Sequence, residues 1–310
     1  MRIVSLIPSA TDIVLKLGLA DRLVGISHEC DLADGMADLP RLTAPKLDPS
    51  ASSGEIDSSV RTLVEAALGV YEIDAEKLQS LAPDIILTQD QCEVCAVSRD
   101  ALAQALAEWT GGRPQLVSLA PSKLDEILDD IQRVAALTGV PEQGITCVLE
   151  AKQRIETVRE RAKARNSTPR VAFLEWLDPL MDGGLWIPEM IEIAGGIPVF
   201  GRTGEHSQKI AAKELIAADP ELIIAAPCGF DFERTAAEFP LLEAIPSIER
   251  LQAVRTNRLA LCDGNRFFNR PGPFMVESLE IIAEILHPQL FGMSGRDTAW
   301  RWRQTDSSTS

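Results

Sequence analysis

One stretch near the middle of the chain restricts the fold more than any other feature. Residues 141–166 contain no helix breaker after Gly144 and are rich in Glu, Lys, Arg and Ala, so they predict one continuous helix. At 1.5 Å per residue this helix is about 39 Å long, the length of a whole domain. Its apolar positions form only a thin stripe, made of Ile145, Val148, Ile155 and Val158. We expect it to link two lobes; the alternative is an ordinary surface helix of one lobe.

On both sides of this stretch, short β-rich segments alternate with helical patterns. The expected strands are 2–7, 23–26, 84–88, 115–119, 170–174, 197–200, 221–225 and 259–262. The expected helices are 13–17 (with N-cap candidates at 9–12), 58–68, 74–81, 98–109, 122–138, 187–194, 207–218 and 273–286. Short apolar strands separated by helices are typical of parallel sheets covered on both faces. The predicted fold class is therefore α/β, with two Rossmann-like lobes whose parallel sheets are joined by one long α-helix.

The same pattern sets the expected domain boundaries. They are an N-terminal α/β lobe at 1–139, a linking helix at 140–167, a C-terminal α/β lobe at 168–290 and a tail at 291–310. The tail is polar and rich in Ser and Thr at its end, so it is expected to fray. Residues 27–57 contain several Pro residues and a Ser-rich stretch, and they are expected to form a loop.

A short internal repeat supports the two lobes. Leu78–Leu87 reads LQSLAPDIIL, and Leu215–Ile224 reads LIAADPELII. In both segments a helix ends before a Pro-acidic pair and is followed by a β-branched strand. We therefore expect the two lobes to share one helix-to-strand junction.

Charge and apolar run lengths exclude several functions. The chain has 310 residues and a formal net charge of −16, which disfavours nucleic acids and anionic membrane surfaces. No run approaches the roughly 18 consecutive apolar residues of a membrane span. The apolar run within Met1–Pro8 is shorter than a secretory signal requires, so the sequence as given predicts a cytoplasmic protein. A truncated gene start would instead allow a periplasmic or surface-anchored one.

Four local motifs resemble one family. Arg2–Asp12 is similar to its opening strand and Pro-x-x-Thr-Glu turn, and Leu19–Gly25 to its second strand. Leu78–Leu87 resembles its Leu-x-x-Leu-x-Pro-Asp-Leu-Ile junction, and Glu192–Gly196 its Gly-Gly turn. This is the class III, helix-linked periplasmic binding protein family, which provides substrate-binding proteins of ABC importers. Ser27–Asp31 looks most like members described as cobalamin-binding. The resemblance implies capture of cobalamin or another corrinoid between the lobes, with haem, siderophore and metal-ion binders as alternatives.

Candidate ligand-binding residues follow the expected strands, because open α/β sheets bind ligands beyond the carboxyl ends of their strands. In the first lobe they are Ser9, Thr11, His28, Tyr71, Gln89 and Gln91. In the second they are Glu175, Trp176, Trp186, Phe230, Asn265, Arg266, Phe267 and Arg270. The aromatic side chains suit a bulky flat ligand, and the arginines suit its amide, carboxylate or phosphate groups. The alternatives are core packing for the aromatic residues and a solvated loop for the polar ones.

A second group of residues suits a metal. His28, Cys30, Cys92 and Cys95 follow two expected neighbouring strands, and three thiolates with one imidazole suit tetrahedral Zn²⁺ or a soft centre such as Fe–S. A redox dithiol or ordinary thiols lining the pocket are the alternatives. His28 as an axial ligand to cobalt is another.

The sequence contains no nucleophile elbow, Walker loop or HExxH motif, so no catalytic residue is expected and the chain is predicted not to be an enzyme. The family resemblance implies one glutamate on each lobe that meets an ABC permease. Seven residues before the junction proline stands Glu76 in the first lobe. The same count in the second lobe falls on Lys213, with Glu214 next, so the docking pair is Glu76 and Glu214. Two cytoplasmic alternatives stay open: an enzyme or metal-centre protein on this frame, and a corrinoid chaperone or sensor.

Overall fold

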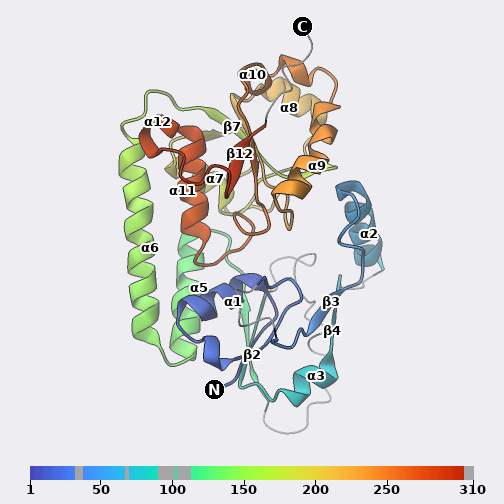
Figure 1. Ribbon diagram of the computed structural model, residues 1–310, viewed down its shortest axis with the longest axis vertical. Coiled ribbons are helices and arrows are strands. Elements are labelled where there is room, and N and C mark those ends of the chain that lie inside the picture. The colour runs from blue at the N-terminus through green and yellow to red at the C-terminus, as the bar shows by residue number, and fades with distance from the viewer. Residues whose placement is uncertain (32–37, 67–69, 90–101, 103–112, 304–310) are drawn as a thin grey trace. The chain divides into compact units, whose positions relative to one another are not determined.

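The structure is a computed structural model that describes residues 1–31, 38–66, 70–89, 102 and 113–303 (Figure 1). The chain divides into two compact units. Unit 1 contains Met1–Pro121 and Glu126–Leu149, and unit 2 contains Ser122–Asp125 and Glu150–Ser310. Each unit has a sheet with helices packed against it, so the predicted α/β class is confirmed.

The main sheet of unit 1 is entirely parallel. Its strands are β1 (Ile3–Ser5), β2 (Leu23–Ile26), β5 (Ile85–Gln89) and β6 (Gln115–Leu119), in the order β2-β1-β5-β6. The helices are α1 (Pro8–Lys16), the short 3₁₀ helix η1 (Ala20–Arg22), α2 (Ser53–Glu65), α3 (Ala75–Ser80) and α5 (Leu124–Leu137). The four strands agree with those predicted, because short buried parallel strands are rich in β-branched residues.

Two expectations for unit 1 were wrong. Ser9 and Thr11 lie inside α1 rather than at its N-cap, because the helix begins at Pro8, whose fixed φ suits a first helical position. Part of the expected 27–57 loop pairs in an antiparallel two-stranded sheet, formed by β3 (Thr43–Pro45) and β4 (Tyr71–Ile73). The predicted helix at 98–109 lies outside the described residues, apart from Leu102.

Unit 2 has a mixed sheet with the path β12-β11-β10-β7-β8, and β9 pairs with β7. Its strands are β7 (Arg170–Leu177), β8 (Leu180–Asp182), β9 (Ile197–Pro198), β10 (Leu222–Ala225), β11 (Leu259–Cys262) and β12 (Trp300–Trp302). The helices are α7 (Ile187–Ile193), α8 (Ala212–Ala218), α9 (Phe232–Glu243), η2 (Ile248–Arg250), α10 (Gln252–Arg255), α11 (Met275–Leu286) and α12 (Pro288–Phe291).

The second sheet has the predicted parallel strands at its centre and antiparallel pairs at two of its edges. β7, β9, β10 and β11 are parallel neighbours, but β8 returns as a hairpin and β12 pairs antiparallel with β11. Trp300–Trp302 was expected in a fraying tail at 291–310. It is instead ordered as a strand because Trp300 is completely buried against the unit.

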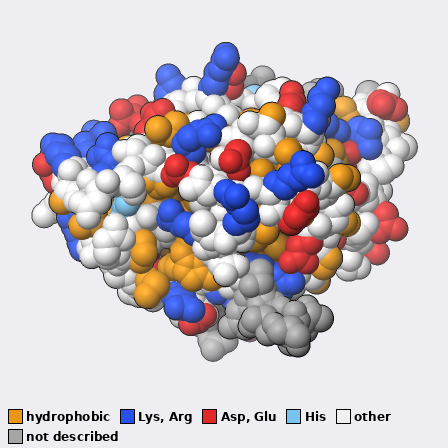
Figure 2. Space-filling model, turned by 90° about the horizontal axis from the view of Figure 1, so that it is seen from above, with side chains coloured by type: hydrophobic (Ala, Val, Ile, Leu, Met, Phe, Trp, Pro, Cys, Tyr) orange, Lys and Arg blue, Asp and Glu red, His pale blue; other side chains and the backbone are white. Residues whose placement is uncertain are grey.

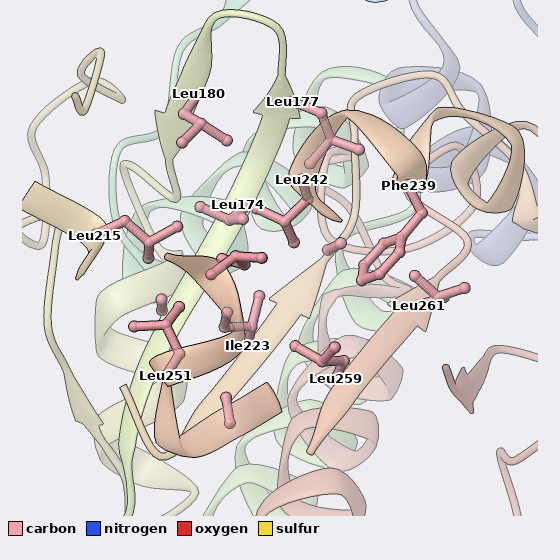
Figure 3. Close-up of a cluster of buried hydrophobic side chains, with 14 residues drawn as sticks. Leu174, Leu177, Leu180, Leu215, Ile223, Phe239, Leu242, Leu251, Leu259 and Leu261 are labelled. Atoms are coloured by element: carbon pink, nitrogen blue, oxygen red, sulfur yellow. The ribbon is translucent and has the colours of Figure 1, made fainter. Parts of the chain in front are cut away.

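The core of unit 2 lies between its central strands and α9. Leu174, Ile223 and Leu261 from β7, β10 and β11 lie in one cluster with Phe239 and Leu242 of α9 (Figure 3). All five side chains are buried, and each buried Leu or Phe contributes about 2–5 kcal/mol of stability relative to Ala. This core fixes the carboxyl ends of the three strands, where the second set of predicted ligand residues lies.

The long helix is α6, Pro141–Ala162. It contributes Pro141–Leu149 to unit 1 and the rest to unit 2, so one long helix joins the units as predicted. Within unit 2, Arg154 pairs with Glu277 at 3.0 Å and Glu280 at 2.7 Å on α11, which lies beside α6 in Figure 1. The helix ends at Ala162, four residues before the expected end at Asn166. The amides of 163–165 donate to carbonyls three residues earlier rather than four, so the α-helical pattern stops there.

The internal repeat is reproduced in three dimensions. Ala82 and Asp219, which precede the two junction prolines, both have left-handed backbones, with φ of 41° and 40°. The amide of the residue after each proline donates to a carbonyl at the start of the neighbouring chain segment. Asp84 N donates to Arg2 O, and Glu221 N donates to Arg170 O, both at 2.9 Å. Each unit therefore has one equivalent helix–Pro–strand junction.

Two further features concern helix length and surface charge. Among the described residues, no helix is both long and apolar enough to cross a membrane. On the face seen in Figure 2, Lys and Arg side chains are interspersed with Asp and Glu. This mixture is typical of a solvent-facing surface.

Candidate ligand-binding site

In unit 1, two side chains hold the loop after β2: Thr43, the first residue of β3, and Arg41, two residues before it. The Thr43 hydroxyl lies 3.0 Å from Ser27 Oγ, 3.0 Å from the His28 amide and 2.7 Å from His28 Nδ1. Arg41 Nη1 donates to the carbonyls of Ser27, His28 and Cys30 at 3.2, 2.8 and 2.9 Å. With its own polar groups paired in this way, the loop presents His28 in one fixed position.

His28 forms a small cluster with Tyr71 and Glu29. The imidazole and phenol ring centres are 5.2 Å apart, and the Tyr71 hydroxyl donates to Glu29 Oε1 at 2.8 Å. Burial lowers the pKa of His28 below its usual value, and the nearby Arg41 charge lowers it further. The imidazole is therefore neutral at pH 7. Among the described residues its Nε2 has no hydrogen-bond partner, so it is available to a ligand.

Of Ser9 and Thr11, it is Thr11 that contacts this loop. Both are buried in the first turns of α1. Thr11 Oγ1 donates to Ser5 Oγ at 2.8 Å and lies 3.2 Å from the Sγ atom of Cys30, which is also buried. These contacts join the first turns of α1 to the loop after β2. Direct ligand contact by Ser9 and Thr11 stays a prediction.

The structure describes only two of the four residues of the predicted metal site, His28 and Cys30. Cys92, Cys95 and the ligand candidate Gln91 lie outside the described residues, and Gln89 is the last residue of β5. Among the residues that the structure describes, no group of three or more His, Cys, Asp or Glu side chains is placed to hold a metal ion. The four-residue site of His28, Cys30, Cys92 and Cys95 stays a prediction.

In unit 2, the end of β7 contacts two neighbouring loops. Glu175 Oε2 accepts from the Gly184 amide at 3.1 Å, and the Glu175 carbonyl accepts from the Cys228 amide at 3.1 Å. The Trp176 ring lies 5.1 Å from that of Phe230, and its Nε1 donates to the Asp178 carbonyl at 2.9 Å. Trp176 is half-buried.

The loop after β11 is closely packed on the loop after β10. Asp263 Oδ1 accepts from the amides of Asn265 and Arg266 at 3.0 and 2.8 Å. Asn265 N donates to the Phe230 carbonyl at 3.0 Å. A Cβ at Gly264 would lie 2.2 Å from the Pro227 carbonyl oxygen, so only glycine permits this approach of the two backbones. The two loops form one rigid edge.

Several predicted side chains gather on this edge. Arg266 is exposed, with its guanidinium carbon 5.5 Å from the Phe267 ring centre, and Arg270 donates to Asn265 Oδ1 at 3.0 Å. Two of the predicted aromatic residues are instead buried. Trp186 donates through Nε1 to the Phe268 carbonyl at 2.8 Å, and Phe230 lies under Arg234 at 3.7 Å. They support the loops, and their contact with a ligand stays a prediction.

Four supporting residues were not predicted. Arg41 and Thr43 lie in a segment expected to be a loop, Arg234 covers Phe230 four residues before it, and Asn269 contacts a segment distant in sequence. Asn269 Nδ2 donates to the carbonyls of Ala226 and Gly264 at 3.2 and 2.7 Å. Asn followed by Arg-Pro-Gly is a turn signal, but nothing in it specifies these acceptors.

The predicted docking glutamates lie on the corresponding helices of the repeat, but Glu214 is one position further along its helix than Glu76. Glu76 lies in the first turn of α3 and Glu214 in the first turn of α8, and both are exposed. Glu214 Oε2 also accepts from the Ala211 amide at 2.7 Å, which stabilises the start of α8. Lys213 beside it is exposed as well. Contact with a permease stays a prediction for both glutamates.

Comparison with known proteins gives the class first. The chain is similar to the vitamin B12-binding protein of Yersinia pestis (strain Pestoides F), with 24% identity over 240 residues, 73% of this chain and 69% of the relative. Its fold matches a periplasmic vitamin B12 binding protein of Vibrio cholerae, with a TM-score of 0.66, 20% identity and coverage of 92% and 96%. A periplasmic heme binding protein of Pseudomonas aeruginosa matches with a TM-score of 0.74, 18% identity and 98% of both chains.

All three relatives are described as binding proteins, so the class is that of ligand-binding proteins. The family follows directly. The chain belongs to the periplasmic binding protein family, whose model matches residues 3–265. The resemblance read from the four sequence motifs is therefore confirmed.

Proposed function

We propose that this protein binds a bulky planar ligand, cobalamin or another corrinoid, through the loops at the carboxyl ends of both sheets. The observation that carries the proposal is the similarity to a vitamin B12-binding protein over 73% of the chain. The motif around His28 pointed to the same ligand. An ABC permease is the proposed partner, with Glu76 and Glu214 as the docking residues.

The chemistry of the two edges supports such a ligand. Tyr71, Trp176 and Phe267 are half-buried, so each offers a rigid apolar surface that is still accessible. Asn265, Arg266 and Arg270 add hydrogen-bond donors for amide and phosphate groups at the rim of a ring system. Because the loops are tied down by internal hydrogen bonds, little conformational entropy is lost when a ligand binds.

Haem is the second candidate, and a specific observation favours it. His28 is neutral at pH 7, its Nδ1 is fixed by Thr43, and its Nε2 is available. A ring nitrogen oriented by a hydrogen bond at the other nitrogen is a common metal ligand. It would serve haem iron or the cobalt of a corrinoid equally well.

Absorbance titration of the purified full chain with cyanocobalamin and with hemin tests the proposal. We expect saturable spectral change with one of the two. His28→Ala is expected to alter the metal-sensitive bands of the complex. His206→Ala, which changes an exposed histidine of unit 2, is expected to leave them unchanged. No saturable change with either probe would contradict the proposed function.

A further inference from the structure

The last described segment, 294–303, lies beyond the residues that match the family model. It is fixed to unit 2 by the buried carboxylate of Glu284. Glu284 Oε2 accepts from the Gly295 amide at 2.9 Å and from Trp300 Nε1 at 3.2 Å, and Ser294 donates to Oε1. Pairing of β12 with β11 completes the attachment. We call residues 294–303 the C-terminal brace.

The brace contacts one proposed ligand loop of unit 2 and the helix start that directly follows the other. The Ala299 carbonyl accepts from the Asp263 amide at 3.1 Å, at the start of the loop after β11. Arg301 pairs with Glu233 at 3.3 Å, and its guanidinium carbon lies 5.2 Å from the Phe232 ring centre. Phe232 and Glu233 are the first residues of α9 and directly follow the loop after β10.

A second arginine of the brace makes the same kinds of contact at the far end of α9. Arg303 pairs with Glu243 at 3.1 Å, and its guanidinium carbon lies 5.4 Å from the Phe239 ring centre. Glu243 is the last residue of α9, whereas Glu233 is near its start. The two arginines therefore differ mainly in whether they hold the end of α9 that adjoins the ligand loop.

We propose that the C-terminal brace positions the two ligand loops, and that Arg301 is its main positioning residue. The inference rests on the proposed function, since it assumes that these loops bind the ligand. Without Arg301, the start of α9 loses its ion pair at Glu233 and its contact at Phe232, and the adjoining Cys228–Asp231 segment is anchored less firmly at that end. The binding-competent loop conformation is then less populated, and the apparent affinity falls by the same fraction.

The test compares Arg301→Ala with Arg303→Ala, because each removes one arginine–glutamate pair and one arginine–aromatic contact from the brace. Exposed ion pairs and cation–π contacts each stabilise a protein only weakly. We therefore expect Arg301→Ala to raise the Kd for cyanocobalamin or hemin about three- to tenfold. Arg303→Ala is expected to change the Kd less than about twofold. Both variants are expected to lower the melting temperature by similar small amounts, since they lose similar contacts.

Hydrogen exchange of the ligand-free proteins gives a second readout. Amides of 228–236 are expected to exchange faster in Arg301→Ala than in Arg303→Ala or the unchanged protein. Equal effects of the two variants on Kd, or equal exchange in this segment, would overturn the proposal. If the unchanged protein binds neither probe, the proposed function fails, and the exchange comparison alone still decides whether the brace orders the loop.

Discussion

The most informative single substitution in unit 1 is Thr43→Val, which removes a hydroxyl and keeps the shape of the side chain. Thr43 is buried, and its hydroxyl serves Ser27 Oγ, the His28 amide and His28 Nδ1. Valine leaves these three groups without that partner in a poorly hydrated position. Leaving buried polar groups unpaired costs about 1–3 kcal/mol each, and partial access of water to His28 reduces the sum. We expect the loop to be destabilised by about 2 kcal/mol.

Hydrogen exchange of the peptide that contains Ile26–Cys30 measures this loss locally. A cost of about 2 kcal/mol corresponds to roughly 30-fold faster exchange of the protected amides. Thr43→Ser is the matched control, because it keeps the hydroxyl and loses only a methyl group. If both variants accelerate exchange equally, or if Thr43→Val has no effect, the hydroxyl does not hold this loop and the reasoning is wrong.

Two further substitutions test unit 1 and unit 2 separately. Burial raises the pKa of Asp130 to about 6, and its Oδ2 has no hydrogen-bond partner among the described residues. The folded state therefore favours the protonated form and loses stability as pH rises from about 4 through 6. Asp130→Asn should therefore raise the melting temperature at pH 8, with the gain shrinking towards pH 4; a gain independent of pH would refute the assignment. Gly264→Ala places a Cβ against two backbone carbonyls and should cost about 3 kcal/mol in urea unfolding, and an unchanged midpoint would show that the two loops can separate freely.

Strands and helices with a strong periodic pattern could be predicted from the sequence. The long charged helix α6 and the β-branched strands β1, β5 and β10 carry their signal within a few neighbouring residues. The strands β3, β4 and β12 are as short as β1, with three residues each, but they lack its adjacent β-branched pair Ile3 and Val4, so no local pattern marks them. Trp300 is buried through its hydrogen bond to Glu284 and the pairing of β12 with β11. Both are tertiary contacts, which the local sequence does not encode.

The candidate site divides in the same way. Its location after the strands follows from topology, and His28, Tyr71 and Arg266 could be named on that basis. Which side chains face outward could not, because Trp186 and Phe230 fall in the expected loops and yet are buried in unit 2. Arg41 and Thr43 hold the loop after β2 through hydrogen bonds to residues about 15 positions earlier in the chain. A sequence pattern does not show which residues pair over such a separation.

The central claim is that loops of both units bind one ligand. Hydrogen exchange of the full chain, with and without saturating cyanocobalamin or hemin, tests it most directly. The account predicts slower exchange in residues 27–31 of unit 1 and also in 227–232 and 263–270 of unit 2, at one ligand per chain. Protection confined to one unit, or spread over helices remote from these loops, would contradict it.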